Sequence, residues 1–159
     1  MMIRLAKEED RKEILALYKM QLGRKFCPWN EEYPGNETID FDLKRDSLFV
    51  MEDEGRIVAA ISVEEDEDVD ALDCWSSDLY PGGELARLAV LPSLQNRGIA
   101  RQMLKYGMAI LKQRGFKSIH FLVNKCNEKA IRSYAVFGFN NVGDCHMYEQ
   151  DMFCYEKEL

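Results

Sequence analysis

The segment from Leu88 to Arg101 contains the residues whose spacing most clearly suggests chemistry. An apolar stretch ends at Pro92 and leads into the pattern Gln95-x-x-Gly98-x-Ala100, where a helical periodicity begins. The first backbone N–H groups of a helix lack partners within the helix and lie at the positive end of its dipole. Such a helix start can bind a diphosphate when small residues leave the backbone accessible. The alternative is an ordinary strand-to-helix turn.

Positive charge beside these small residues comes from Arg97 and Arg101, at the rim of the same candidate site. The cysteines offer no comparable site, because their number is odd and no two of them form a C-x-x-C pair. Cys74 and Cys126 could suggest a nucleophile, but no histidine stands in a partnering motif, which favours ordinary thiols. The sequence therefore predicts no disulfide framework and no metal site.

Segments with the apolar spacing of a helix and segments with that of a strand follow one another along the chain, and together they would position the loop. In chain order we expect a strand Met2–Leu5, a helix Glu8–Leu22, a structured loop Arg24–Asn36, a helix Thr38–Asp46, strands Ser47–Glu52 and Arg56–Val63, a central strand Glu84–Leu91, a helix Arg97–Arg114, a strand Ile119–Val123, a helix Glu128–Phe137, and strands Asn141–Met147 and Asp151–Glu156. Asp53-Glu54-Gly55 predicts a hairpin turn. The acidic stretch Glu64–Asp73 is either the solvated end of that hairpin with its loop or an acidic binding tract.

The composition indicates one intracellular domain over residues 1–159. A chain of 159 residues can bury roughly 70% of the surface that its unfolded form exposes, without a disulfide or metal. The net charge of −7 argues against nucleic acid as a partner and suits a cationic one such as an amine, although it also fits plain solubility. A charged N-terminus and the absence of a membrane-length apolar run predict a cytoplasmic protein that does not bind membranes.

Two motifs together resemble the GNAT superfamily of N-acetyltransferases. The first is the Gln95-x-x-Gly98-x-Ala100 loop after an apolar strand and a proline turn. The second follows the strand Ile119–Val123 and reads Asn127-x-x-Ala-x-x-x-Tyr134, with Phe137-Gly138-Phe139 behind it. The order of elements also agrees, so the resemblance covers essentially the whole chain. It implies an α+β fold, a three-layer α/β/α sandwich whose mixed, mostly antiparallel sheet of about six to seven strands has a splayed central pair.

The resemblance also implies acetyl-CoA as the acyl donor, with no metal. The backbone of Leu88, Ala89 and Val90 would bind the pantetheine arm at a bulge, because a bulge frees ladder N–H and C=O groups for a ligand. The residues implied for the pyrophosphate loop are Gln95, Asn96, Arg97, Gly98, Ile99, Ala100 and Arg101. Asn127 would serve the cofactor arm, or it caps its helix.

Catalysis in such an enzyme is direct attack of the acceptor amine on the thioester, without an acyl-enzyme. Tyr134 matches the family tyrosine that lies near the cofactor sulfur and protonates the departing thiolate; the alternative is a core tyrosine. For the general base, Glu84 stands near the position where family members carry a carboxylate that faces the amine through water, or it is an edge charge. His120, on a strand facing the site, either contributes to the acceptor side or is structural.

The acceptor side is expected to include the aromatic loop between the first two helices. Trp29 and Tyr33 could stack on a substrate or enclose its cation, with Glu31 or Glu32 adding charge. The alternative is that these aromatic rings only pack the loop onto the sheet. The sequence does not identify the acceptor or the acyl chain, and it leaves monomer and homodimer open.

Three functions remain compatible with these residues. The first is acetylation of a small-molecule amine by an acyltransferase of the class that transfers groups other than aminoacyl groups. The second is acetylation of a protein or peptide amine, which needs an open groove. The third is a noncatalytic acyl-CoA sensor that keeps the phosphate loop and has lost turnover.

Overall fold

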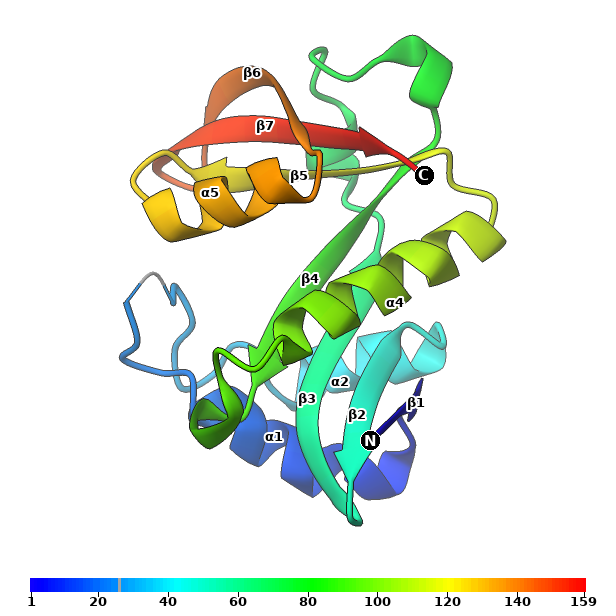
Figure 1. Ribbon diagram of the computed structural model, residues 1–159, viewed down its shortest axis with the longest axis vertical. Helices are drawn as coiled ribbons and strands as arrows, with labels where there is room; N and C mark the ends of the chain where they lie inside the picture. Colours follow the sequence, from blue (N-terminus) through cyan, green and yellow to red (C-terminus); the bar gives the residue numbers. More distant parts are fainter. Residues whose placement is uncertain (26) are drawn as a thin grey trace. The chain divides into compact units, whose positions relative to one another are not determined.

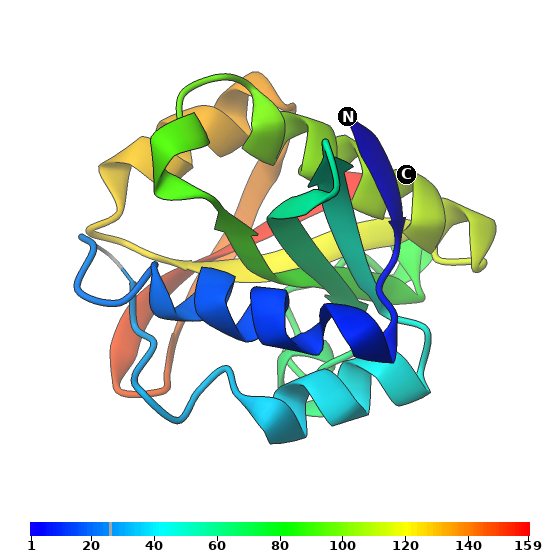
Figure 2. The same cartoon turned by 90° about the horizontal axis from the view of Figure 1, so that it is seen from below.

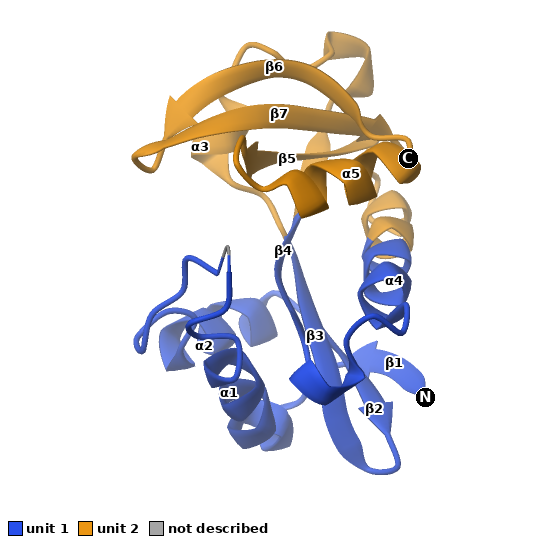
Figure 3. Cartoon of the chain, turned by 60° about the vertical axis from the view of Figure 1, so that its left-hand side comes forward, with its two compact units in different colours: residues 1–63, 85–107 blue, residues 64–84, 108–159 orange. Residues whose placement is uncertain are grey.

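The computed structural model describes residues 1–25 and 27–159 (Figure 1). Phe26, which we expected in the aromatic loop, lies outside the described residues. The seven strands form a mixed sheet in the order β1-β2-β3-β4-β5-β7-β6, and with its helices the chain has the α+β fold that the sequence predicts. Two compact units divide the chain, residues 1–63 with 85–107 (unit 1) and residues 64–84 with 108–159 (unit 2) (Figure 3).

Unit 1 is built around three strands that follow one another in the sheet. Its elements are β1 (Met2–Leu5), a 3-10 turn (Glu8–Asp10), α1 (Arg11–Lys19), α2 (Asn36–Lys44), β2 (Leu48–Asp53), β3 (Arg56–Glu64), most of β4 (Gly82–Val90), a 3-10 turn (Pro92–Leu94) and the first part of α4 (Ile99–Gln113). β1 pairs antiparallel with β2, and β2 pairs antiparallel with β3. The predicted hairpin at Asp53-Glu54-Gly55 forms, with Glu54 and Gly55 joining β2 to β3 as a two-residue turn at φ values of +49° and +78°.

Helices cover both faces of the unit 1 strands. On one face α1 and α2 lie side by side (Figure 2), and Ile14 of α1 and Ile39 of α2 share a buried cluster with Val50 of β2. On the other face the start of α4 packs on the strands, where the rings of Phe49 and Tyr106 meet edge to face at 5.4 Å. Most residues of β2 and β3 are buried, and because successive side chains point to opposite faces they pack against both helix layers.

Unit 2 contains the C-terminal strands and the connection between β3 and β4. Its elements are α3 (Glu67–Asp70), a 3-10 turn (Ser77–Leu79), the first residues of β4, the end of α4, β5 (Ser118–Asn124), α5 (Glu128–Val136), β6 (Asn140–Met147) and β7 (Gln150–Glu158). β5 pairs in parallel with β4 at Gly82 and Gly83, and antiparallel with β7, which pairs antiparallel with β6. Successive residues of β5 face opposite sides, so that Phe121 meets the α5 ring Tyr134 and His120 meets Trp75.

The predicted element order is correct, and the main differences lie at ends and in the acidic stretch. The first helix ends at Lys19 rather than Leu22, and the residues after it form turns. Within Glu64–Asp73, which the simpler interpretation treated as a solvated loop, the short helix α3 is capped by Asp66, whose Oδ1 accepts from the N–H groups of Asp68 and Val69 at 2.9 and 3.3 Å. Val69 is only 2% exposed and anchors this helix by apolar burial.

Candidate active site

The predicted diphosphate loop forms a strand, a turn and a helix start within unit 1. Beyond β4 the Leu91 N–H donates to the Val58 carbonyl at 2.8 Å, which ties the beginning of the loop to β3. Asn96 and Gly98 then take φ values of +62° and +79°, and α4 begins at Ile99. This turn presents the first N–H groups of α4 at the end of the loop, as the diphosphate hypothesis requires.

Gly98 leaves open space at the beginning of α4. A Cβ added to Gly98 would meet no atom within 4 Å, so the glycine is needed for its left-handed backbone rather than for close packing. Asn96, Arg97, Ala100 and Arg101 are exposed around it. The loop therefore offers accessible amides with two guanidinium groups nearby.

The side chain of Gln95 connects the diphosphate loop to Arg24 and to the end of β4 through hydrogen bonds. Its Oε1 accepts a short hydrogen bond from Arg24, and its Nε2 donates to the Val90 carbonyl at 3.5 Å. The same carbonyl accepts from Nε2 of Gln21 at 3.0 Å. The end of β4 is thus held by two amide side chains, and a cofactor contact of Gln95 stays a prediction.

Arg87, which the sequence interpretation missed, gives β4 an irregular backbone just before Leu88, Ala89 and Val90. Its φ is +51°, a left-handed value that a non-glycine residue takes at a cost and that interrupts regular strand geometry. The guanidinium holds the Asp42 carboxylate with two groups, Nη2 to Oδ1 at 2.9 Å and Nε to Oδ2 at 3.2 Å. No local sequence signal marks this residue, because its partner stands far away in the chain.

The buried carboxylate of Asp42 is the centre of this network. It is fully buried, and its Oδ2 also accepts from the Ser62 hydroxyl at 2.7 Å, while Arg45 donates to Oδ1 at 3.0 Å. A buried carboxylate is tolerated when it is paired and hydrogen-bonded on both oxygens. The network therefore fixes α2, β3 and β4 together in unit 1.

The two aromatic residues of the predicted acceptor loop lie in different environments. Trp29 packs on the unit 1 core, with its ring edge to face against Tyr18 at 5.5 Å. Tyr33 is 46% exposed, and its hydroxyl accepts from Nη1 of Arg87 at 3.3 Å. Packing accounts for Trp29, whereas Tyr33 keeps an exposed ring face that a substrate could reach.

Tyr134 lies in an aromatic cluster of unit 2. Its ring centroid is 4.6 Å from that of Phe121 and 5.6 Å from that of Phe139, across α5, β5 and the segment before β6. Burial raises the pKa of the Tyr134 phenol, because the phenolate is poorly solvated there. The group therefore carries its proton at neutral pH, as a proton donor must.

Asn127 is the N-cap of α5, and its Oδ1 accepts from the Ala130 N–H at 3.2 Å. This contact gives Asn127 the capping role that the sequence left open. A cofactor contact through the rest of its side chain stays a prediction.

Glu84 is half-buried on β4 and contributes to an acidic neighbourhood in unit 2. The turn between β6 and β7 brings the Tyr148 hydroxyl to Oδ2 of Asp66 at 3.2 Å. Burial together with the carboxylates of Asp66, Asp68 and Glu84 raises the pKa of Tyr148 to about 12. Both central residues of this turn, Tyr148 and Glu149, have positive φ, a hairpin turn without glycine that the sequence did not reveal.

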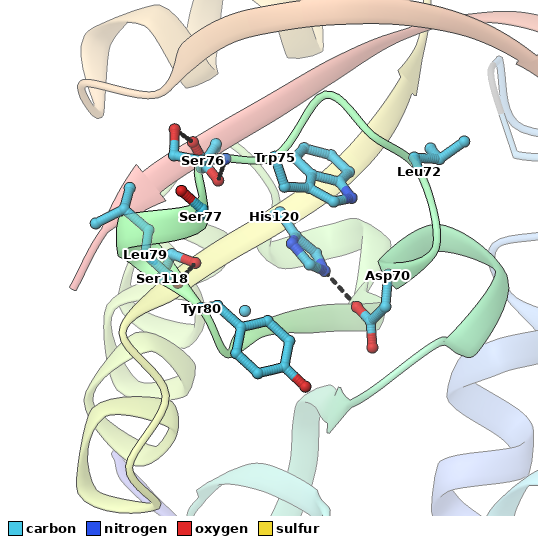
Figure 4. Close-up of a pocket in the computed structure, with 11 residues that line it drawn as sticks. Asp70, Leu72, Trp75, Ser76, Ser77, Leu79, Tyr80, Ser118 and His120 are labelled. Carbon is cyan, nitrogen blue, oxygen red and sulfur yellow. Dashed lines mark hydrogen bonds and ion pairs between the residues drawn. The ribbon is translucent and has the colours of Figure 1, made fainter.

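His120 lines a pocket of unit 2 beneath the connection between β3 and β4 (Figure 4). Its Nε2 lies 2.6 Å from Oδ1 of Asp70, and its ring stacks on Trp75 with centroids 4.3 Å apart. Asp70 and Trp75 were missed as site residues, although the alternative of an acidic binding tract over Glu64–Asp73 was the signal that could have found Asp70.

The structure thus places the predicted residues in two sets. Unit 1 contains the β4 backbone, the diphosphate loop, Trp29 and Tyr33, whereas unit 2 contains Glu84, His120, Asn127 and Tyr134.

Comparison with known proteins identifies the family. The sequence matches the acetyltransferase (GNAT) family over residues 14–139, so the chain belongs to this family of acyltransferases, which use acetyl-CoA. A comparison with curated proteins gave no match.

Solved structures with the same fold include an N-acetyltransferase from Staphylococcus aureus Mu50, 22% identical, with a TM-score of 0.73 over 99% of this chain and 97% of the other. A ribosomal-protein-alanine N-acetyltransferase from Brucella melitensis is 20% identical, with a TM-score of 0.77 and full coverage of both chains at 100%. The structure of yncA from Salmonella typhimurium, solved with its cofactor acetyl-CoA, is 17% identical, with a TM-score of 0.75 over 100% and 94% of the two chains. At these sequence identities the structural similarity shows that the chain shares the fold of these proteins.

Among residues 1–25 and 27–159, no group of three or more His, Cys, Asp and Glu side chains is arranged to hold a metal ion. In the part of the chain that the structure describes, no helix combines the length and apolar character needed to cross a membrane.

Proposed function

We propose that the chain transfers the acetyl group of acetyl-CoA to a primary amine, by direct attack of the amine within a ternary complex, and that the acceptor is a small molecule. The observation that carries the proposal is the loop from Leu91 to Arg101. Its open glycine, its exposed arginines and the N-terminus of α4 fit a diphosphate. The family match over residues 14–139 supports the same cosubstrate.

The roles of the chain's own groups follow from their environments. Bound acetyl-CoA would supply the activated thioester, and the backbone of Leu88, Ala89 and Val90, next to the irregular Arg87, would hold its pantetheine arm. Tyr134 would give its proton to the leaving sulfur, since a phenol is protonated at neutral pH and can act as a general acid. Two unit 2 groups are candidates for removing the acceptor's proton, Glu84 on β4 and His120 on β5.

A protein or peptide amine is the second candidate acceptor. It is favoured by the structural likeness to enzymes named ribosomal-protein-alanine N-acetyltransferases, one from Brucella melitensis and one from Escherichia coli with 19% identity. At such identities the likeness supports the fold more than the acceptor, so we rank it second. A noncatalytic acyl-CoA sensor is the third candidate.

The test is a screen of amines and N-terminal peptides in which the release of free CoA from acetyl-CoA is followed. We expect turnover with at least one small primary amine above the rate of acetyl-CoA hydrolysis. Turnover only with peptides whose N-terminal residue is alanine would favour the second candidate, a protein or peptide acceptor. Tight acetyl-CoA binding with no transfer to any member of the panel would favour the sensor.

A further inference from the structure

Arg87 combines a strained backbone with a buried side chain within β4. Its φ of +51° lies in the left-handed region, and its side chain is only 6% exposed. Residues in such conformations cluster at ligand sites, where the surrounding structure keeps them in place against the strain. The backbone of Arg87 therefore needs a partner that holds it, and a ligand site is the expected place for it.

The Asp42 carboxylate on α2 is the partner of Arg87. The planar guanidinium meets both carboxylate oxygens, with Nη2 at 2.9 Å from Oδ1 and 3.1 Å from Oδ2, and Nε at 3.2 Å from Oδ2. The carboxylate is itself fixed, because Ser62 donates to Oδ2 at 2.7 Å and Arg45 to Oδ1 at 3.0 Å. A carboxylate in a fixed position thus defines where the guanidinium of Arg87 lies.

Stability alone does not account for this buried ion pair. Both charges lose their hydration, and replacement of a buried pair by well-packed apolar residues is often neutral or stabilising. The pair can do what an apolar residue at position 87 cannot, because a left-handed residue with a Cβ is disfavoured by about 5–30-fold against an ordinary conformation. Without the pair, the backbone at Arg87 would relax toward regular strand geometry.

The left-handed residue stands next to the backbone assigned to the acyl donor. β4 pairs with β5 at Gly82 and Gly83, at the beginning of the strand, and residues Leu88 to Val90 lie further along it. A residue outside regular strand geometry turns neighbouring N–H and C=O groups out of the ladder, where a ligand can reach them. Relaxation of Arg87 would turn these groups away from the donor.

The same guanidinium contacts Tyr33 in the loop assigned to the acceptor. Nη1 of Arg87 donates to the Tyr33 hydroxyl at 3.3 Å. The Tyr33 backbone is fixed by Asn30, whose Oδ1 accepts from the Tyr33 N–H at 2.9 Å and whose N–H donates to the Tyr33 carbonyl at 3.0 Å. With its backbone and its hydroxyl both held, the 46% exposed ring presents its free face in one orientation.

We propose that Asp42 and Arg87 are positioning residues for acetyl transfer. The Asp42 carboxylate holds Arg87 in its left-handed conformation, which keeps the backbone of Leu88 to Val90 open to the acyl donor. The guanidinium held in this way orients the Tyr33 ring toward the acceptor. One buried ion pair in unit 1 therefore sets the geometry for both substrates. This inference rests on the acetyl-transfer function proposed above.

Two substitutions of Arg87 separate the role of its backbone from that of its side chain. Arg87→Ala and Arg87→Gly both remove the guanidinium, but only glycine takes a positive φ without strain. In calorimetry, Arg87→Gly should therefore bind acetyl-CoA about 5–30-fold more tightly than Arg87→Ala. A purely structural role predicts no such advantage, because glycine within a strand is destabilising relative to alanine. If Arg87→Ala does not fold, Asp42→Asn is added to both variants, which removes the charge left buried.

The chain provides a matched control in a second arginine–carboxylate pair of unit 1. Nη1 and Nη2 of Arg4 donate to Asp10 at 2.8 and 3.0 Å, and β1, which contains Arg4, is separated from β4 by β2 and β3. Asp42→Asn should raise the Kd of acetyl-CoA by up to about 30-fold, and it should also raise the acceptor KM. Asp10→Asn should lower the Tm and leave both constants at their wild-type values.

Tyr33→Phe tests the acceptor half by itself. It removes only the hydroxyl and should raise the acceptor KM by about 2–10-fold, the worth of one hydrogen bond, with kcat and the Kd of acetyl-CoA unchanged. An unchanged KM in Tyr33→Phe would overturn this half.

The inference as a whole fails if Arg87→Gly and Arg87→Ala bind acetyl-CoA equally, or if Asp42→Asn keeps the wild-type Kd and KM, and the proposed function then stands. Equal losses in Asp10→Asn would also overturn it, because the effect would then be general destabilisation. If no amine in the panel is acetylated, the proposed function fails, and the calorimetric order of the two Arg87 variants alone decides the inference.

Discussion

Substitution of Gly98 by Glu separates the folding role of this glycine from its proposed role in cofactor binding. Gly98 has φ +79°, and a Cβ added there would meet no atom within 4 Å, so we expect the stability cost to come mainly from the left-handed backbone. That cost is about 1–2 kcal/mol, and in a chain of this length each kcal/mol lowers the Tm by about 2–4 °C. Gly115, at the other end of α4, has φ +92° and equally open surroundings. Gly98→Glu and Gly115→Glu should therefore lose similar stability.

The two variants should differ in their affinity for acetyl-CoA. A carboxylate about 4 Å from a phosphate charge is repelled by about 1 kcal/mol in water and about 4 kcal/mol at an effective dielectric constant of about 20. Since about 1.4 kcal/mol is a factor of ten, Gly98→Glu should weaken binding by about five- to a thousandfold, and the bulk of the side chain adds to this loss. Gly115→Glu should bind like the wild type.

Isothermal titration calorimetry with acetyl-CoA, combined with thermal unfolding of both variants, measures these quantities. Because the repulsion is electrostatic, added salt should reduce the loss in Gly98→Glu. An unchanged Kd in folded Gly98→Glu would refute the assignment of the diphosphate loop. Equal losses in the two variants would show that the effect is structural.

Three further predictions concern other parts of the proposed site. Tyr134→Phe should lower kcat by about 10²-fold with acetyl-CoA affinity unchanged, because the ring contacts survive and only the proton is lost; a normal kcat in the folded variant would leave water as the acid. Tyr33→Ala should raise the acceptor KM and leave the Tm at its wild-type value, whereas Trp29→Ala should lower the Tm because its ring packs on the core. We expect the double variant to raise the acceptor KM more than it raises the Kd of acetyl-CoA. Equal losses on both ligands would limit the loop to a structural role. Asp42→Ala should cost about 3–5 kcal/mol in urea unfolding, since it leaves the guanidinium of Arg87 buried without its carboxylate; a cost below about 1 kcal/mol would mean that the pair does not hold β4.

The sequence predicts the element order because local patterns determine it. Continuous apolar runs predict β2 and β3, and the hairpin at Glu54 and Gly55 follows from the Asp-Glu-Gly turn signal. The start of α4 also follows from a local motif, since the helical period is predicted to begin at Arg97 and the helix begins two residues later, at Ile99. These elements depend little on distant contacts.

The features that the sequence could not reveal depend on residues far apart in the chain. The left-handed Arg87 is held by Asp42, which stands on another element, and a lone arginine in an apolar run gives no sign of this. His120 gains its partner only when α3 folds over β5, and the acidic stretch around Asp70 looks like a solvated loop until Val69 is buried. Tertiary contacts override local propensity at these positions.

Transfer of an isotopically labelled acetyl group from acetyl-CoA to an amine is the most direct test of the central claim. The labelled cosubstrate would be incubated with the amine panel and either wild-type protein or Gly98→Glu, and the products analysed by mass spectrometry. We predict labelled acetyl on the nitrogen of at least one small primary amine with the wild type, and far less with Gly98→Glu. Binding of acetyl-CoA without labelled product from any amine or peptide would contradict the account and identify the chain as an acyl-CoA sensor.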